Sequence, residues 1–316
     1  MVDINYIRRY FDEYASKWSP RAYGGGTATA SYPVGAHRMR LAIEQITNHI
    51  GSTDCKMIDL GCGGGELCIH AALLGMNATG IDISEGMISE AKKRRDSVPE
   101  EVQSRLTFLV ADALQNQFPP QNYDAVAALG LIEYLPDDED FFKEAYRLLR
   151  AGGILVVSCR NRLFNLFSLN DYTTREIEDG FGEDLLFELR PLLEKAVPKE
   201  LMMKFVQNLE LIVPDLKEAI EFDMKTEEKN EKRGKDVKKF EEGRRQHTPT
   251  GFWSSAKKEG FGNPIFVGVH PHPLPPRVEN SCPRFYNQFG RAFEIFESLP
   301  VSLVWSSAFI AVFTKY

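Results

Sequence analysis

The segment from Cys55 to Ser158 alternates short apolar runs with amphipathic runs, a pattern typical of parallel strands joined by helices. The predicted strands are Lys56–Leu60, Ala78–Ile83, Leu106–Val110, Tyr123–Leu129 and Ile154–Ser158. The predicted helices between them are Glu66–Leu74, a helix that Ser84 caps at its N-terminus, and Glu139–Leu149. This alternation predicts an α/β fold, in which one parallel sheet carries helices on both faces.

The alternation stops after Ser158. Residues 160–247 have helical patterns over Glu183–Ala196 and Leu201–Leu211 but no clear strand. The alternation returns at Thr248-Pro249, a favourable pair for starting a helix. The later predicted elements are a strand over Pro264–His270, a helix over Phe285–Leu299 and a strand over Ala308–Thr314. We therefore interpret residues 54–159 and 248–316 as one core domain, residues 1–53 as an N-terminal helical cap, and residues 160–247 as a mainly helical insert.

Glycine dominates the turn after the first predicted strand, where the sequence reads Asp59-Leu60-Gly61-Cys62-Gly63-Gly64-Gly65. Glycine lets a ligand approach the backbone closely, because it has no side chain to clash. The N-terminus of the following helix adds oriented N–H donors. Dinucleotide-binding folds share such a turn, but their fingerprint is Gly-x-Gly-x-x-Gly. Glu66 stands where that fingerprint needs its third glycine, so the sequence disfavours a dehydrogenase.

Two acidic residues follow the next two predicted strands. Asp82 ends the second strand, where its carboxylate can accept hydrogen bonds from both hydroxyls of a ribose. Asp112 ends the third strand, where it can accept a hydrogen bond from an adenine amino group. Alternative interpretations are a turn-bonding role for Asp59 and a surface position for Asp82. The ordered spacing of the glycines and acids favours a site for an adenosine-containing cofactor.

With these motifs, the chain resembles the class I S-adenosylmethionine-dependent methyltransferase family, closely over about residues 54–158 and more loosely at its end. The resemblance implies a Rossmann-like sheet of seven strands in the order 3-2-1-4-5-7-6, with the last two strands in an antiparallel hairpin. It implies S-adenosyl-L-methionine as the cofactor. The residues expected to bind that cofactor are Asp59, Gly61, Cys62, Gly63, Gly65, Asp82, Ile83, Met87, Asp112, Ala113, Leu129, Tyr14, Trp18 and Arg38.

The N-terminal segment resembles the helices that family members fold over the cofactor. Tyr14, Trp18 and Tyr23 lie at near-helical spacing and are expected to close the pocket, with Arg38 or Arg40 meeting the cofactor carboxylate. An aromatic stripe of this kind is also typical of plain core packing. Gly24-Gly25-Gly26 is interpreted as a flexible, gating loop.

The methyl acceptor is expected beyond the carboxyl ends of the strands, where ligands bind in open α/β sheets. Glu133 and Tyr134 follow the fourth predicted strand and are candidate catalytic residues. His247 precedes the Thr248-Pro249 helix start, which places it at the same rim, and it is the candidate general base. The alternative is a histidine that only packs beside the cap.

Substrate contacts are expected from the residues after the fifth strand and from the start of the insert. The candidates are Arg160, Asn161, Asn170 and Tyr172, whose polar groups suit a polyhydroxylated or polar acceptor. Ordinary turn chemistry and a helix cap explain Asn170 equally well. His270 and His272 could form a metal pair, but the sequence places no third ligand, so no metal is expected.

Charge and cysteine content narrow the class of partner. The chain has 38 Lys and Arg against 45 Asp and Glu, a formal charge of −7, which argues against nucleic acid as a partner.

The cysteines point to the compartment. The chain has 5 of them, an odd number without Cys-x-x-Cys spacing, as expected in the reducing cytoplasm. The first residues lack a signal-peptide pattern, and no apolar run approaches the roughly 18 residues of a membrane span. No membrane association is expected.

The sequence thus predicts an S-adenosylmethionine-dependent methyltransferase that acts on a small polar molecule, with O-methylation favoured and a sugar or other biosynthetic intermediate as acceptor. An N-methyltransferase and an RNA or protein methyltransferase are the alternatives within the enzyme class. An alternative of another class is a non-catalytic protein that binds S-adenosylmethionine as a scaffold. Intact glycines and Asp82 favour cofactor binding without establishing transfer.

Overall fold

One seven-stranded sheet forms the centre of the protein, with the strands in the order β3-β2-β1-β4-β5-β7-β6. The computed structural model describes residues 3–23, 32–52, 54–226 and 244–316. The strands are β1 (Lys56–Leu60), β2 (Asn77–Asp82), β3 (Leu106–Val110), β4 (Tyr123–Leu129), β5 (Leu149–Arg160), β6 (Ile265–Pro271) and β7 (Ser306–Thr314). This order confirms the expected topology.

The pairing of the strands brings their carboxyl ends to one rim. Strands β1 to β5 pair in parallel, with Asp59 opposite Gly80 of β2 and Ala127 of β4. Strand β7 runs antiparallel to both β5 and β6, so β6 again points the same way as β1 to β5. The ends of β1, β2, β4, β5 and β6 therefore border a common site.

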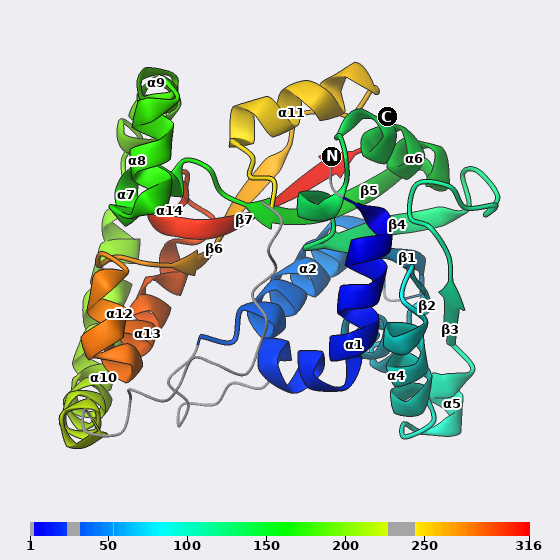
Figure 1. The fold of residues 1–316 in the computed structure, drawn as a ribbon, viewed down its shortest axis with the longest axis horizontal. Coiled ribbons are helices and arrows are strands. Elements are labelled where there is room, and N and C mark those ends of the chain that lie inside the picture. Colours follow the sequence, from blue (N-terminus) through cyan, green and yellow to red (C-terminus); the bar gives the residue numbers. More distant parts are fainter. Residues whose placement is uncertain (1–2, 24–31, 53, 227–243) are drawn as a thin grey trace.

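Helices cover both faces of the sheet (Figure 1). Buried side chains of α2 (Val34–Ile50), α3 (Glu66–Leu73) and α4 (Glu85–Arg95) pack on one face. Those of α6 (Glu139–Leu148) and α11 (Pro249–Lys258) pack on the other. The remaining helical elements are α1 (Ile4–Tyr23), α5 (Glu100–Gln103), η1 (Ile132–Tyr134), α7 (Phe164–Ser168), α8 (Asp171–Glu178), α9 (Gly182–Leu193), α10 (Lys199–Thr226), α12 (Arg277–Ser281), α13 (Pro283–Ala292), η3 (Phe293–Phe296) and α14 (Ser302–Trp305).

The two predicted helix starts are confirmed by their caps. The Ser84 hydroxyl accepts a hydrogen bond from the Met87 N–H at 3.0 Å, and Thr248 accepts one from the Gly251 N–H at 3.1 Å. Pro249 occupies the first turn, where its missing N–H costs nothing.

The predicted and observed boundaries differ most at three places. The helix over Glu139–Leu149 ends at Leu148, and β5 begins directly at Leu149 instead of Ile154. The helix predicted over Leu201–Leu211 continues to Thr226. The single helix predicted over Phe285–Leu299 is α13 followed by the short 3₁₀ helix η3.

Helices α7 to α10 lie at one end of the molecule beside α12 and α13, opposite the end formed by β3, α4 and α5 (Figure 1). These four helices come from the segment between β5 and α11. Their exposed side chains include Phe187, Met203 and Leu211. Among the described residues, no helix combines the length and apolarity that crossing a membrane requires.

Candidate functional site

A cavity opens above the turn that joins β1 to α3, and we call it the cofactor cavity. Its walls are residues 61–64 of that turn, Asp82 and Ile83 after β2, residues 129–131 after β4, and parts of α1, α2 and η1. Gly63 adopts a left-handed conformation, with φ of 51°, and a Cβ there would meet no atom within 4 Å. The turn thus presents bare backbone to open space, as a site for a closely approaching ligand requires.

The carboxylate of Asp82 braces this turn. One of its oxygens accepts a hydrogen bond from the Gly63 N–H at 3.0 Å, and the other accepts one from the Ser84 N–H at 2.9 Å. Burial raises the pKa of Asp82, although these two N–H donors oppose the rise. Each carboxylate oxygen keeps a second lone pair, so Asp82 can still accept hydrogen bonds from a ligand in the cavity.

Asp59 and Gly65 belong to the same motif but do not line the cavity. The Asp59 side chain is 3% exposed, and its Oδ1 has no hydrogen-bond partner among the described residues. Burial, reinforced by the charge of Asp82, raises the pKa of Asp59 well above its ordinary value. Gly65 has φ of 80°, and a Cβ there would lie 2.6 Å from the Phe108 ring. Gly65 is therefore required for packing of α3 against β3.

Helix α1 covers the cavity and is fastened beside Asp82. The Asp12 carboxylate accepts hydrogen bonds from the Ser84 hydroxyl at 2.6 Å and from the Gly86 N–H at 2.9 Å. This contact places a negative charge at the N-terminus of α4, where the helix dipole favours it. Ile7 and Phe11 of α1 then line the cavity.

Arg38, Glu133 and Gly130 form the opposite wall. A Cβ on Gly130 would lie 2.9 Å from Nη1 of Arg38 and 3.9 Å from Oε1 of Glu133. The Arg38 Nε and the Glu133 Oε2 are both buried and have no hydrogen-bond partner among the described residues. A cationic donor and a carboxylate acceptor are thus available side by side, at the end of β4.

Tyr134 and Arg244 close the cavity from the insert side. The Tyr134 ring packs edge-on against Phe11 at 5.4 Å, and the Arg244 guanidinium lies 5.6 Å from its centroid. Burial, with a further contribution from Glu133, raises the pKa of Tyr134, so its phenol stays protonated at neutral pH. Aromatic rings here exclude water from the cavity.

His247 is held away from this cavity. Its Nε2 lies 2.9 Å from Oδ1 of Asp138, and its backbone bonds Arg160 and Arg162. It is not among the residues that line the cavity. Its Nδ1 is buried without a hydrogen-bond partner among the described residues, so that nitrogen remains available for proton transfer. The base role of His247 stays a prediction.

The predicted substrate residues differ in whether their side chains already have hydrogen-bond partners and whether they are exposed. Asn161 is 1% exposed, and both amide hydrogens are donated, to the backbone oxygens of Leu303 and Ser306. Asn161 therefore joins β5 to α14. Its amide hydrogens are already used within the protein, which conflicts with the predicted contact of Asn161 with substrate. The Asn170 side chain accepts a hydrogen bond from the Tyr172 N–H at 2.9 Å and thereby caps α8. This helix cap is the alternative interpretation of Asn170 given in the sequence analysis. Tyr172 is exposed, 6.0 Å from the Arg160 guanidinium.

The cofactor cavity brings together many of the residues predicted from the sequence. Those that line it are Gly61, Cys62, Gly63, Asp82, Ile83, Met87, Ala113, Leu129, Tyr23, Arg38, Glu133 and Tyr134. Asp112 does not, because its carboxylate turns back to the Leu114 N–H at 2.8 Å. Tyr14 packs on Tyr10 instead. The side chain of Trp18 and the whole of Gly24-Gly25-Gly26 lie outside the described residues.

The lining residues that were not predicted as site residues are Ile7, Phe11, Gly64, Glu66, Ala111, Gly130, Leu131 and Arg244. Glu66 contacts Arg94, which also donates to the Gly64 carbonyl at 3.0 Å. Glu66 is the first residue of α3, directly after the glycine turn. That position in the sequence could have indicated that Glu66 lines the cavity. Phe11 belongs to the aromatic stripe of the N-terminal segment, which was a signal for it. Arg244 carried no such signal, since it reaches the cavity through long-range packing.

The two histidines considered above as a metal pair, His270 and His272, lie close together. The rings of His270 and His272 lie 3.9 Å apart, and His272 Nδ1 is hydrogen-bonded to the Tyr286 hydroxyl. Ligand atoms of His37, Glu294 and Glu297, within the described part of the chain, approach one another to within 4.8 Å. Arg40 lies 3.7 Å from both carboxylates and supplies positive charge there.

Comparison with known proteins assigns a family to the central segment. The profile of the family described as "Methyltransferase domain" matches residues 58–157. A ubiquinone biosynthesis O-methyltransferase of Pseudomonas putida is 32% identical over 122 residues, which cover 39% of this chain and 51% of that protein. The chain therefore spans about half the length of the curated relatives it matches.

Solved structures share the fold over almost the whole chain. Magnesium protoporphyrin IX methyltransferase of Synechocystis, solved with bound S-adenosylhomocysteine, has a TM-score of 0.53 at 14% identity and covers 99% of both chains. The cyclase SpnF has a TM-score of 0.54 at 15% identity, covering 98% of this chain and 95% of its own. At such identities the likeness concerns the fold alone.

Proposed function

Because residues 58–157 are a class I S-adenosylmethionine-dependent methyltransferase domain, we propose that the protein transfers a methyl group from this cofactor to a hydroxyl of a small polar molecule. The observation that carries the proposal is one cavity lined by both the glycine turn with Asp82 and the pair Arg38 and Glu133. Groups that suit the cofactor, Asp82 and Arg38, and a carboxylate that suits an acceptor hydroxyl, Glu133, therefore line the same cavity.

The residues present fit the cofactor. The bare backbone at Gly63 leaves space for it, and the free lone pairs of Asp82 suit a ribose. The unpartnered Arg38 Nε suits a carboxylate, and the buried, unpartnered Asp59 Oδ1 lies beneath the turn as a further acceptor. When bound, S-adenosylmethionine supplies an electrophilic methyl group on a sulfonium.

The chain's own groups then have separate tasks. Phe11 and Tyr134 exclude water, which would otherwise compete with the acceptor. Glu133 accepts the proton that an acceptor hydroxyl loses as its oxygen forms a bond to the methyl carbon, and its unpartnered Oε2 is available for this. His247 is the alternative base, through its unpartnered Nδ1.

O-methylation is supported by the name of the Pseudomonas putida relative, an O-methyltransferase, and by the presence of carboxylate and imidazole bases near the rim. The net charge of −7 favours a small molecule over nucleic acid. We further propose that residues 1–53 and 160–247 act as cap and insert that select this acceptor. Arg244 and Phe11, one from each segment, line the cavity and support that division.

A methyl-transfer screen tests the proposal. The protein is incubated with methyl-labelled S-adenosylmethionine and a metabolite extract, and products are separated into small-molecule and macromolecular fractions and identified by mass spectrometry. We expect label in the small-molecule fraction. Glu133→Gln should lower the rate by about 100-fold or more, with S-adenosylhomocysteine affinity within about threefold of wild type.

Two results would contradict it. Label in precipitated RNA or protein would favour a macromolecular acceptor. S-adenosylhomocysteine binding without transfer to any fraction would favour the non-catalytic alternative, and the cyclase SpnF shows that this fold is not confined to methyltransferases.

A further inference from the structure

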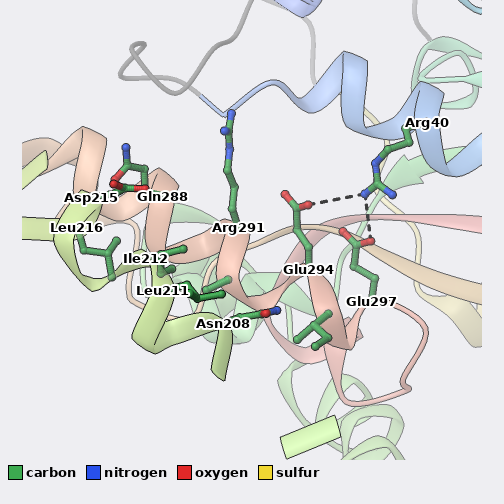
Figure 2. A pocket seen from close by; sticks show the side chains of 12 residues that line it. Arg40, Asn208, Leu211, Ile212, Asp215, Leu216, Gln288, Arg291, Glu294 and Glu297 are labelled. Carbon is green, nitrogen blue, oxygen red and sulfur yellow. Dashed lines mark ion pairs between the residues drawn. The ribbon is translucent and has the colours of Figure 1, made fainter. Parts of the chain in front are cut away.

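A second pocket lies at the insert end of the molecule, between α10 on one side and α13 with η3 on the other (Figure 2). Its volume is about 570 Å³. Small-molecule sites in proteins have volumes of roughly 300–1,000 Å³, so its size suits a small ligand. None of its lining residues lines the cofactor cavity. We call it the insert pocket.

The walls of the insert pocket are fastened at both of its ends. At one end, the Phe205 ring packs against Phe293 and Phe296, each with centroids 4.9 Å away. At the other end, the Asp223 carboxylate, 3% exposed as a residue, accepts hydrogen bonds from the backbone N–H groups of Arg284 and Phe285. The pocket lies between these anchors, so its shape is set by packing and exists before a ligand binds.

A proline, Pro214, lies inside α10 beside the pocket. It stands between the lining residues Ile212 and Asp215 and does not line the pocket itself. Proline has no N–H for the carbonyl of Glu210, four residues earlier, and its ring clashes with that carbonyl. A helix bends at such a residue.

The floor of the pocket is apolar. Its apolar lining residues are Leu211, Ile212, Leu216, Ala292 and Ile295. Leu216 and Ala292 are buried, whereas Leu211 is 76% exposed. Apolar side chains that remain open to water are stabilised by covering them, at about 25 cal/mol for each Å² buried.

The polar groups at one edge satisfy one another. Arg40 lies 3.7 Å from carboxylate oxygens of both Glu294 and Glu297 (Figure 2). Glu294 also contacts the Tyr32 hydroxyl, and Glu297 contacts the His37 ring. Burial raises the pKa of Glu297 to about 8, so this carboxyl carries little negative charge at neutral pH. The edge is therefore close to neutral and needs no further ion.

Arg291 carries a positive charge that none of the carboxylates in this network pairs with. Within the described residues, the structure gives its guanidinium no carboxylate within 4.0 Å and no hydrogen bond, only the Tyr32 ring at 5.9 Å. Its side chain extends from α13 along the pocket (Figure 2). Asp215, which also lines the pocket, is exposed, so water solvates and screens its charge.

We propose that the insert pocket binds a small amphiphilic carboxylate, with its apolar body on the floor and its carboxylate on Arg291. The guanidinium fits a carboxylate through two parallel N–H donors, a geometry that neutral or cationic head groups cannot match. This site is separate from the cofactor cavity and does not depend on the proposed methyl transfer.

Three eight-carbon probes on the intact protein test the proposal: octanoate, octan-1-ol and octylammonium. Binding is followed by saturation-transfer NMR and by calorimetry. We expect octanoate to bind one site saturably with Kd below about 1 mM, and octylammonium to bind at least about tenfold more weakly. Octylammonium binding equal to octanoate, or no saturable octanoate binding, would overturn the proposal.

Two arginine variants locate the site. Arg291→Gln should weaken octanoate about tenfold while leaving octan-1-ol within about twofold. Arg277→Gln is the matched control, since Arg277 is exposed on the neighbouring helix α12 and does not line the pocket. Both variants should retain wild-type affinity for S-adenosylhomocysteine, which shows that they fold. An equal loss of octanoate in the two variants would place the carboxylate elsewhere and overturn the assignment to Arg291.

Discussion

The imidazole of His247 is joined to the carboxylate of Asp138, with Nε2 2.9 Å from Oδ1. Arg245 approaches the same carboxylate oxygen at 2.7 Å. Burial alone would raise the pKa of Asp138, but the hydrogen bond from His247 and the charges of His247 and Arg245 outweigh it and hold the pKa below its ordinary value. The pair ties the end of the insert to the segment that follows η1.

Asp138→Asn should destabilise the protein by about 3 kcal/mol, because it leaves both His247 and Arg245 without their carboxylate. His247→Gln should cost less, about 1 kcal/mol, because Asp138 keeps its ion pair with Arg245. S-adenosylhomocysteine affinity should stay within about threefold, since neither residue lines the cofactor cavity. Chemical denaturation and calorimetry measure the two quantities. A general-base role for His247 adds a distinct signature, a loss of kcat of about 100-fold or more in His247→Gln. Asp138→Asn should share part of this loss, because Asp138 holds Nε2 of His247 and leaves Nδ1 to accept the proton.

The pH dependence of this effect has a defined sign. The pKa of Asp138 is lower in the folded state than in the unfolded chain. The contribution of Asp138 to the free energy of unfolding is therefore complete above the ordinary aspartate pKa of about 4, and it is lost as the pH falls through the folded value. The stability difference between wild type and Asp138→Asn should therefore shrink between about pH 5 and pH 3. A difference that grows over this range would contradict the account.

Asp82→Ala should weaken S-adenosylhomocysteine by about 100-fold, because it removes a charged acceptor and the brace on the Gly63 N–H. Asp96→Ala is the control, since that carboxylate is exposed and bonds only Arg95 among the described residues. Burial raises the pKa of Asp82, so wild-type affinity should fall as the pH drops through that raised value. Calorimetry across pH should show a flatter profile for Asp82→Ala.

Gly63→Ala should mainly lower cofactor affinity, whereas Gly65→Ala should mainly lower the stability of the fold. Gly65→Ala places a Cβ 2.6 Å from Phe108, so it should destabilise the fold by about 1–3 kcal/mol through overpacking, in addition to backbone strain. Gly63→Ala meets no atom within 4 Å, and its Cβ would occupy ligand space. It should therefore lose more cofactor affinity than stability. Thermal melts and calorimetry separate the two variants, and equal melting losses would argue against this distinction.

Asp12→Ala should speed dissociation of S-adenosylhomocysteine by about tenfold, because α1 loses its hydrogen bonds to Ser84 and Gly86 and opens more often. Glu13→Ala, at the exposed neighbouring position, is the control. Stopped-flow fluorescence gives the rates. Unchanged dissociation in Asp12→Ala would mean that α1 does not limit release.

The cofactor half of the site was predictable because its residues lie close together along the chain. Gly61, Gly63 and Asp82 stand at the ends of two adjacent parallel strands, and the spacing of strand, turn and helix brings them together. Asp112 was placed on the right strand end, yet its side chain bonds the Leu114 N–H. Strand position is a local property, whereas side-chain direction depends on competing hydrogen bonds.

The sequence by itself determined the alternation of strands and helices, the glycine turn and the acid that braces it, since these follow from short-range periodicity and from residue types with few alternative conformations. The order of the strands in the sheet was expected only from the family resemblance, because periodicity does not specify which strands pair. Only the tertiary structure decided that Asp12 meets Ser84, that Arg244 reaches Tyr134, and that α10 leaves a pocket beside α13. Contacts of this kind join segments far apart in the chain. They depend on how whole helices pack, and no local pattern of residues encodes that packing.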